Sequence, residues 1–232
     1  MRVGILALQG DFREHLQVVE RLGAEGVEVR EPQDLKGVDR LIIPGGESTT
    51  ISLLLRESGL SEEIRRLGRA GLPLFGTCAG LILLAREVFD GDKEEERVDP
   101  LGLIDIAVRR NAYGRQIESF EEELEVSGLG KVQAVFIRAP KIISAGPNVQ
   151  LLAYQEGTPV LAREGKVLVS SFHPELTEDL RLHLLVRGGV KHHACGTGEP
   201  SDMSCIQNPS PTFSPLLFGI GVEIDVIGCV GA

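Results

Sequence analysis

A chain of 232 residues, 42% of them hydrophobic, is long enough for one α/β domain with a full core, or for a domain and an appendage. Its formal net charge of −10 argues against a nucleic-acid-binding surface, and no apolar run is long enough to span a bilayer. Cys78 is the only cysteine before position 195, which excludes a disulfide framework from the main body. A reducing cytoplasm is therefore the expected setting.

The first part of the chain alternates strand-like and helix-like segments. Residues 3–8 form a continuous apolar run, typical of a parallel strand that is covered on both faces. Apolar residues then recur at helical spacing, and short apolar runs at 27–29 and 41–43 predict two more strands. Two further helical segments precede a fourth strand that ends near Cys78. This order predicts an α/β fold, with a doubly wound, mostly parallel central sheet flanked by helices.

Beyond residue 100 the pattern changes to short strand candidates separated by turn residues. We expect these strands to form an antiparallel or mixed extension of the same sheet rather than a second domain. A last helix is predicted over residues 177–187, with Thr177 as its cap and Leu180, Leu184 and Leu185 on its apolar face. The strand candidates are residues 104–108, 124–126, 132–137, 149–154, 159–163 and 166–170.

Cys78 lies in a Gly-x-Cys-x-Gly element between an apolar strand and an apolar helix-like run. This is the layout of a nucleophile elbow with cysteine in place of serine. Gly76 and Gly80 permit a sharp turn and a close approach of helix to strand, and the helix N-terminus favours a thiolate. The alternative is a buried structural cysteine, which is common for free cysteines. The two flanking glycines favour the elbow.

His173-Pro174-Glu175 follows the strand candidate at 166–170. A nucleophilic cysteine needs a base within hydrogen-bond reach, and the base needs an orienting partner. His173 fits the first role and Glu175 the second, while His15 and His183 fall on helix patterns and are expected at the surface or the edge of the core. A partly exposed strand-end histidine is the alternative for His173. Because Cys78 also lies at a strand end, catalysis is the better interpretation.

An acyl-transfer site also needs donors for the oxyanion. The N–H of Ala79, directly after the nucleophile, is one candidate. Gly46 offers a second N–H from the loop after a neighbouring strand, although Pro44-Gly45-Gly46 is also compatible with an ordinary turn. Spacing alone therefore predicts a thiol acyl-transfer or hydrolysis site, and it leaves the substrate open.

Several stretches over residues 1–187 resemble the triad, or class I, glutamine amidotransferases, and more narrowly the glutaminase subunits of pyridoxal phosphate synthase complexes. The Gly-x-Cys-x-Gly and His-Pro-Glu elements are general to the wider class. Ile82 stands where many class members carry Gln, as in the pyridoxal phosphate branch. The stretches specific to the narrower family are Gly45-Gly46-Glu47-Ser48-Thr49-Thr50 and Arg110-Asn111-Ala112-Tyr113-Gly114-Arg115-Gln116.

The resemblance implies hydrolysis of L-glutamine to L-glutamate and ammonia through a Cys78–His173–Glu175 triad, with Gly46 and Ala79 as the oxyanion hole. It implies that ammonia passes to the synthase (lyase) subunit of a multi-subunit pyridoxal 5'-phosphate synthase complex, for vitamin B6 biosynthesis. Neither a metal nor an organic cofactor is implied. By position, the residues that line the glutamine site are Gly45, Gly46, Glu47, Arg110, Ile137 and Arg138.

Residues 188–232 depart from the family pattern and form an atypical tail that contains Gly, Pro and Cys residues. Gly188-Gly189 breaks the helix that should continue past residue 187. His192, His193, Cys195 and Cys205 match no zinc-binding spacing, so we predict no metal site there. We expect a disordered or aberrant tail, with docking onto the domain at 1–187 or onto a second copy as the alternative.

Two other function classes stay open. A stand-alone cysteine hydrolase or redox-responsive protein on a similar sheet would not need Gly45-Gly46-Glu47 together with His173-Pro174-Glu175. A regulatory, non-catalytic binding module would be expected to have lost part of its triad, whereas all three residues are present. Glutamine-dependent ammonia release, measured with and without the synthase subunit, separates these classes.

Overall fold

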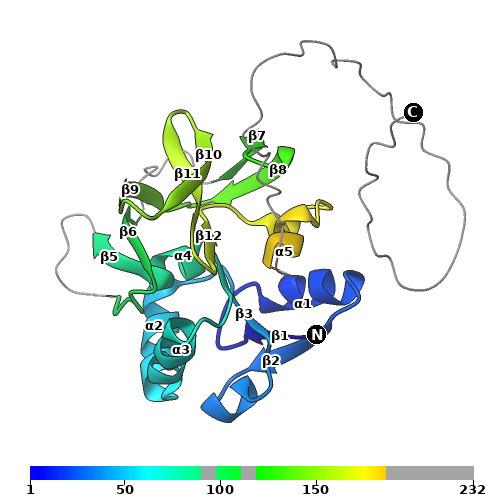
Figure 1. The fold of residues 1–232 in the computed structure, drawn as a ribbon, viewed down its shortest axis with the longest axis vertical. Helices are drawn as coiled ribbons and strands as arrows, with labels where there is room; N and C mark the ends of the chain where they lie inside the picture. Colours follow the sequence, from blue (N-terminus) through cyan, green and yellow to red (C-terminus); the bar gives the residue numbers. More distant parts are fainter. Residues whose placement is uncertain (90–97, 111–118, 187–232) are drawn as a thin grey trace, which may run out of the picture. The chain divides into compact units, whose positions relative to one another are not determined.

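The computed structural model describes residues 1–89, 98–110 and 119–186 (Figure 1). The predicted tail, with its histidines and cysteines, and residues 111–116 of the family-specific stretch lie outside the described residues. The domain boundary at 187–188 therefore stays a prediction.

A seven-stranded sheet in the order β10-β11-β12-β4-β3-β1-β2 forms the centre of the fold (Figure 1). Its five adjacent strands β12, β4, β3, β1 and β2 pair in parallel, and β10 and β11 extend it antiparallel. The predicted fold class is confirmed. The bounds are β1 (Arg2–Leu6), β2 (Glu25–Val29), β3 (Arg40–Ile43), β4 (Leu74–Thr77), β10 (Gln150–Gln155), β11 (Thr158–Glu164) and β12 (Val167–Ser170).

Two smaller sheets accompany the central one. β5 (Ala85–Phe89), β6 (Ile104–Arg109) and β9 (Lys141–Ala145) form a three-stranded sheet, and β7 (Ser119–Val126) and β8 (Gly130–Ile137) form a hairpin. The expectation of one continuous extension was therefore wrong for these strands. β5 and β9 were not predicted, because each buries only one of its residues and so lacks a regular apolar alternation.

Helices cover both faces of the central sheet, as a doubly wound fold requires (Figure 1). Because side chains alternate along a strand, Leu41 and Ile43 of β3 join one apolar cluster while Ile42 joins the other. The first cluster includes residues of α2 (Ser48–Glu57), α3 (Leu60–Arg69) and α4 (Ala79–Leu84). The second includes residues of the β7–β8 hairpin, α1 (Phe12–Arg21) and α5 (Arg181–Val186).

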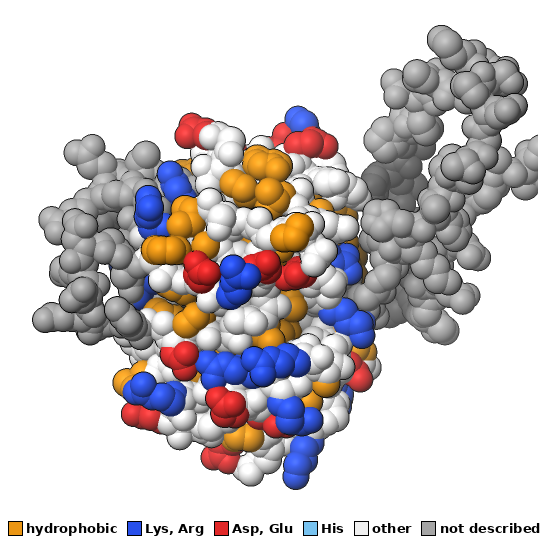
Figure 2. All heavy atoms as spheres, turned by 60° about the vertical axis from the view of Figure 1, so that its left-hand side comes forward, with side chains coloured by type: hydrophobic (Ala, Val, Ile, Leu, Met, Phe, Trp, Pro, Cys, Tyr) orange, Lys and Arg blue, Asp and Glu red, His pale blue; other side chains and the backbone are white. Residues whose placement is uncertain are grey.

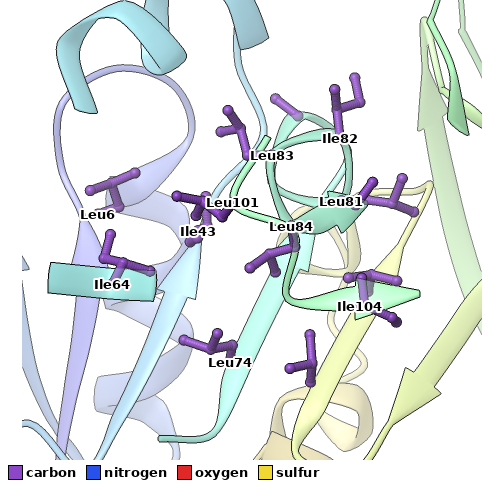
Figure 3. Close-up of a cluster of buried hydrophobic side chains, with 14 of the residues drawn as sticks. Leu6, Ile43, Ile64, Leu74, Leu81, Ile82, Leu83, Leu84, Leu101 and Ile104 are labelled. Atoms are coloured by element: carbon purple, nitrogen blue, oxygen red, sulfur yellow. The ribbon is translucent and has the colours of Figure 1, made fainter. Parts of the chain in front are cut away.

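The short helix α4 lies at the centre of the first cluster. All six of its residues are buried, and Leu81 to Leu84 point in different directions into surrounding apolar side chains (Figure 3). Leu6 and Ile43 contribute from the sheet, and Ile64 contributes from α3. A helix that is apolar all round in this way is fixed by packing on every side. The residue that precedes it, Cys78, is therefore anchored to the most buried part of the domain.

The last described helix begins later than predicted. Residues Pro174–Leu176 form a single 3-10 turn, η2, and the Thr177 hydroxyl donates to the Pro174 carbonyl at 3.0 Å. α5 begins at Arg181, whose backbone N–H donates to the Asp179 carboxylate at 3.0 Å. Its predicted apolar face was wrong at Leu184, which is exposed, whereas Leu185 is partly buried against the second cluster. The buried side chains of this helix are Leu182 and His183. The other 3-10 turn, η1, spans Pro32–Leu35.

Acidic and basic side chains lie interspersed on the face drawn in Figure 2. This mixture fits a chain with 24 basic and 34 acidic residues better than a basic nucleic-acid-binding surface would. Within the described ranges, every helix is too short or too polar to cross a membrane.

Candidate active site

Cys78 lies at the turn between β4 and α4. Its backbone adopts φ 49° and ψ −99°, a conformation that residues other than glycine rarely adopt. The Cys78 N–H donates to the Ser170 carbonyl at 2.8 Å, which ties the turn to the end of the neighbouring strand β12. The strand, sharp turn and helix predicted around Cys78 are therefore present, and the side chain is 8% exposed.

The elbow depends on glycine at position 80. A Cβ atom there would lie 2.0 Å from the carbonyl oxygen of Ile43, which shows that α4 packs directly against the backbone of β3. This close packing brings the ends of β3 and β4 together. The loop after β3 and Cys78 after β4 consequently share one edge of the sheet, where α/β folds of this type bind their ligands.

His173 and Glu175 form a buried pair beside Cys78. The Nδ1 atom of His173 lies 2.8 Å from Glu175 Oε1. The backbone N–H of His173 donates to the Val135 carbonyl at 2.8 Å. Cys78 is near enough to His173 to contribute to the raised pKa of its imidazole. Since Nδ1 is used by Glu175, Nε2 is the nitrogen left for the cysteine, as a nucleophile–base–orienter arrangement requires.

The electrostatics of the pair favour the charged forms of both residues. Burial acts to lower the pKa of His173, but hydrogen bonds with Cys78 and Glu175 outweigh it and raise the pKa to about 10. Burial acts to raise the pKa of Glu175, yet the neighbouring His15 and His173 hold that pKa well below its usual range. An imidazolium next to a cysteine is the arrangement that stabilises a nucleophilic thiolate.

Asp11 supplies a second carboxylate to this histidine. Its Oδ2 atom lies 3.4 Å from His173 Nδ1, and burial raises the pKa of Asp11 despite the opposing charge of His173. Asp11, His173 and Glu175 present ligand atoms within 4.8 Å of one another, close enough to hold a metal ion. The His173 and Glu175 atoms in that set are already hydrogen-bonded to each other, which favours a triad over a metal centre.

The loop Pro44-Gly45-Gly46 after β3 is held by residues 9 and 11. The Gly45 carbonyl accepts from the Asp11 N–H at 3.2 Å, and the Glu47 N–H donates to the Gln9 side-chain oxygen at 2.8 Å. A Cβ at Gly45 would lie 2.3 Å from His173 Cε1, so this loop packs directly on the imidazole ring. Gly46 and Ala79 thus follow adjacent strands, and their role as oxyanion donors stays a prediction.

Gly45→Ala tests this contact between loop and base. The added methyl group cannot fit at 2.3 Å from the imidazole, so His173 must move away from Cys78. We expect kcat for glutamine hydrolysis to fall at least about 100-fold, because a misplacement of about 1 Å has that effect on a reacting group. Steady-state kinetics with thermal unfolding as the control measure it. A folded variant with normal kcat would show that the loop yields instead of the histidine.

The predicted glutamine-binding residues fall into two groups. Ile137 lies beside Cys78, with its carbonyl oxygen 3.8 Å from Cys78 Sγ, and Arg138 follows it with φ 43°. Glu47 and Arg110 lie together: the Arg110 guanidinium is 3.4 Å from a Glu47 carboxylate oxygen and 3.0 Å from the Thr49 hydroxyl. Their contact with glutamine stays a prediction.

Glu47 has a structural task as well. Its carboxylate accepts from the N–H groups of Thr49 at 3.0 Å and Thr50 at 2.6 Å, which caps the N-terminus of α2. These bonds outweigh its partial burial and lower the pKa of Glu47. The carboxylate is therefore fixed and charged where it meets Arg110.

The sequence analysis did not predict that two histidines, His15 and His183, are buried near Glu175. His15 and His183, expected at the surface or the edge of the core, are buried, with exposures of 0% and 4%, so a surface position was wrong for both. His15 Nδ1 lies 3.0 Å from His183 Nε2. The signal for His15 was its spacing: it lies three and four residues before Val18 and Val19, on the buried face of α1. For His183 the adjacent buried Leu182 is a weaker signal, because neighbouring helix residues do not share a face.

An α/β sheet with a strained cysteine and a hydrogen-bonded His–Glu pair at adjacent strand ends is the arrangement expected of a cysteine-dependent hydrolase or amidotransferase. A model of the SNO glutamine amidotransferase family matches residues 5–190. The chain belongs to the SNO glutamine amidotransferase family, and the resemblance stated from its motifs is confirmed.

Known proteins of similar sequence agree with this assignment. A Thermus thermophilus protein named "Pyridoxal 5'-phosphate synthase subunit PdxT" is 60% identical over 78% of this chain and 93% of the relative. A protein of the same name from Thermotoga neapolitana is 50% identical over 79% of this chain and 96% of the relative. A solved structure titled "Crystal structure of glutamine amidotransferase" shares 55% identity and a TM-score of 0.75, covering 79% of this chain and 96% of its own.

Proposed function

We propose that Cys78, His173 and Glu175 hydrolyse the side-chain amide of L-glutamine and release L-glutamate and ammonia. The observation that carries the proposal is the 2.8 Å bond from His173 Nδ1 to the buried Glu175, beside a cysteine held at a strained strand–helix turn. The family assignment supports glutamine as the substrate, since the family consists of glutamine amidotransferases.

In this mechanism the Cys78 thiolate attacks the amide carbon, and the oxyanion that forms is stabilised by the N–H groups of Ala79 and Gly46. His173 gives the proton on Nε2 to the departing nitrogen, so ammonia leaves and a glutamyl thioester remains. Water then loses a proton to Nε2 as it attacks the thioester, which releases glutamate and restores the thiolate and the imidazolium. Glu175 holds the ring through Nδ1 throughout both steps.

Glutamine is proposed to bind between the loop Gly45-Gly46-Glu47 on one side and Ile137 and Arg138 on the other. Arg110, which Glu47 and Thr49 hold in place, is the proposed partner for the α-carboxylate. A guanidinium matches the planar geometry of a carboxylate and stays charged throughout the accessible pH range.

The chain is proposed to supply its ammonia to the synthase subunit of a pyridoxal 5'-phosphate synthase, in the cytoplasm. Relatives at 50–60% identity carry the name of a subunit of that synthase, which supports a partner that consumes the ammonia. The test is ammonia release from glutamine, measured with and without a synthase subunit. Ammonia release from other amides as readily as from glutamine would favour the stand-alone hydrolase. No ammonia release, with or without the synthase subunit, would favour the non-catalytic module.

The isolated chain is expected to be a poor glutaminase that the synthase subunit activates. The gate is the Gly45–Gly46 peptide, whose carbonyl is now held by the Asp11 N–H at 3.2 Å. A flip of this peptide exchanges the positions of its N–H and C=O groups, and glycine allows such a flip. An oxyanion hole that lacks one donor loses about 10²–10³ in kcat, so titration of the partner at saturating glutamine should recover that factor.

Two outcomes contradict the gate. A kcat that is already maximal without the partner, and unchanged by it, rules it out. A partner that changes only KM acts on glutamine binding and not on the oxyanion hole.

A further inference from the structure

The Glu175 carboxylate has polar neighbours on the side that faces away from His173. Thr77, the residue before the nucleophile, lies with its hydroxyl 3.5 Å from Glu175 Oε1. His15 Nε2 lies 3.2 Å from that hydroxyl and 3.5 Å from the same carboxylate oxygen. On the other side of the ring, His15 Nδ1 lies 3.0 Å from His183 Nε2. We call Thr77, His15 and His183 the rear cluster.

The rear cluster is buried, although it consists of three polar side chains. Thr77 and His15 are 0% exposed, and His183 is 4% exposed. They come from three elements, β4, α1 and α5, that share no sequence neighbourhood. Buried polar groups are unfavourable unless they are hydrogen-bonded, so three of them converging on one carboxylate call for an explanation beyond packing.

One arrangement of protons satisfies every donor of the cluster. His183 Nε2–H donates to His15 Nδ1, His15 Nε2–H donates to Thr77 Oγ1, and the Thr77 hydroxyl donates to Glu175 Oε1. His183 then carries no proton on Nδ1, which fits the finding that this atom has no hydrogen-bond partner in the described residues. Burial, the largest cause, lowers the pKa of His183, so its ring is neutral. In this series of hydrogen bonds, each donor points toward Glu175.

Glu175 needs this support. A buried carboxylate must be compensated by hydrogen bonds to remain ionised, and Glu175 Oε2 has no partner among the described residues. The contacts of the carboxylate therefore converge on Oε1, which accepts from His173 and Thr77. Without the rear cluster, His173 would be the remaining hydrogen-bond partner of Oε1, and the carboxylate would be held from one side only.

We propose that His15 and His183 are positioning residues of the triad, which act through Thr77 to hold the Glu175 carboxylate where it orients His173. They touch neither the substrate nor the reacting sulfur. The proposal rests on the proposed glutaminase function for its kinetic test. A second test, the reactivity of the Cys78 thiolate, does not depend on glutamine.

The decisive comparison is His15→Leu against His15→Gln, each assayed with the synthase subunit present. Leucine removes both ring nitrogens, whereas the glutamine amide places an N–H group near the position of Nε2. We expect His15→Leu to lower kcat about 10–100-fold, as the loss of outer partners does for metal-bound histidines, with KM for glutamine unchanged. His15→Gln should recover most of the loss, and the same pair of substitutions at His183 should show the same order with smaller effects.

Val18→Ala is the matched control on the same helix. Val18 is 3% exposed and belongs to the same buried face of α1, so its truncation costs stability without removing a polar group of the rear cluster. It should keep the wild-type kcat at a temperature where it is folded. Thr77→Val removes the linking hydroxyl at nearly constant shape, and it tests the proposal if His15→Leu does not fold.

The second readout is the rate of Cys78 alkylation by iodoacetamide as a function of pH. A loosened Glu175 stabilises the His173 imidazolium less, so the midpoint of alkylation should move to higher pH in His15→Leu and Thr77→Val, but not in Val18→Ala. Unchanged kcat and midpoint in folded His15→Leu or Thr77→Val would overturn the proposal, as would an equal loss of kcat in Val18→Ala. If wild type releases no ammonia from glutamine, the proposed function fails, whereas the alkylation midpoints still decide the role of the rear cluster.

Discussion

Cys78→Ala is expected to abolish glutamine hydrolysis while the chain stays folded and still binds glutamine. Removal of the nucleophile from a catalytic triad lowers kcat by about 10⁶-fold, because no other group can form the covalent intermediate. The small side chain of alanine adds no atom to the crowded turn between β4 and α4. Ammonia release measures the loss, and the thermal midpoint together with glutamine binding shows that the fold and the site remain.

Labelling supplies the internal control for this prediction. An electrophile that mimics glutamine should alkylate Cys78 alone, although the chain has four cysteines. The other three, Cys195, Cys205 and Cys229, lie outside the described residues and lack the elbow sequence. Peptide mass spectrometry identifies the labelled residue. Preferential labelling of one of these three would contradict the assignment of Cys78.

Glu175→Gln is expected to lower kcat by about 10⁴-fold with little change in glutamine binding. The glutamine amide can donate to His173 Nδ1, which then carries no proton, and the proton moves to Nε2. An imidazole in that tautomer cannot accept a proton from Cys78. His173→Asn should be at least as damaging, since it removes the base itself. Near-normal turnover in either folded variant would mean that the base lies elsewhere.

Glu175→Gln should also change how the stability of the fold depends on pH. The pKa of Glu175 is lowered on folding from 4.5, so its contribution to stability is fully present above about pH 4.5 and is lost as the pH falls further. The pKa of His173 is raised from 6.5 to about 10, so its contribution is present below pH 6.5 and is lost as the pH rises toward 10. The stability of Glu175→Gln should vary less at both ends of this range.

The reactive end of the site could be predicted from sequence because its residues lie in local patterns. Gly-x-Cys-x-Gly encodes a sharp turn through its own glycines, and His173 and Glu175 are two residues apart, close enough for one turn to pair them. The parallel sheet then brings Cys78 and His173 together, since β4 and β12 are adjacent and end at the same edge.

The rear cluster could not be predicted in the same way. His15 and His183 are separated by 168 positions, and their contact depends on α1 and α5 covering the same face of the sheet. A histidine in an amphipathic helix gives no sign of whether it faces solvent or a buried carboxylate. The start of α5 likewise coincides with a side-chain contact, the Asp179–Arg181 bond, four residues after the cap expected at Thr177.

The backbone of Cys78 sets activity and stability against each other at a single position. A non-glycine residue in a sparsely populated conformation costs about 1–3 kcal/mol, and only the surrounding packing keeps it there. Selection for folding alone would therefore favour glycine at position 78. Such a chain would be more stable, and it would lack the thiol of the proposed reaction. A cysteine maintained at this position over evolutionary time would be a mark of continued demand for its chemistry, and thermostability engineering guided by conformational preference alone would remove it first.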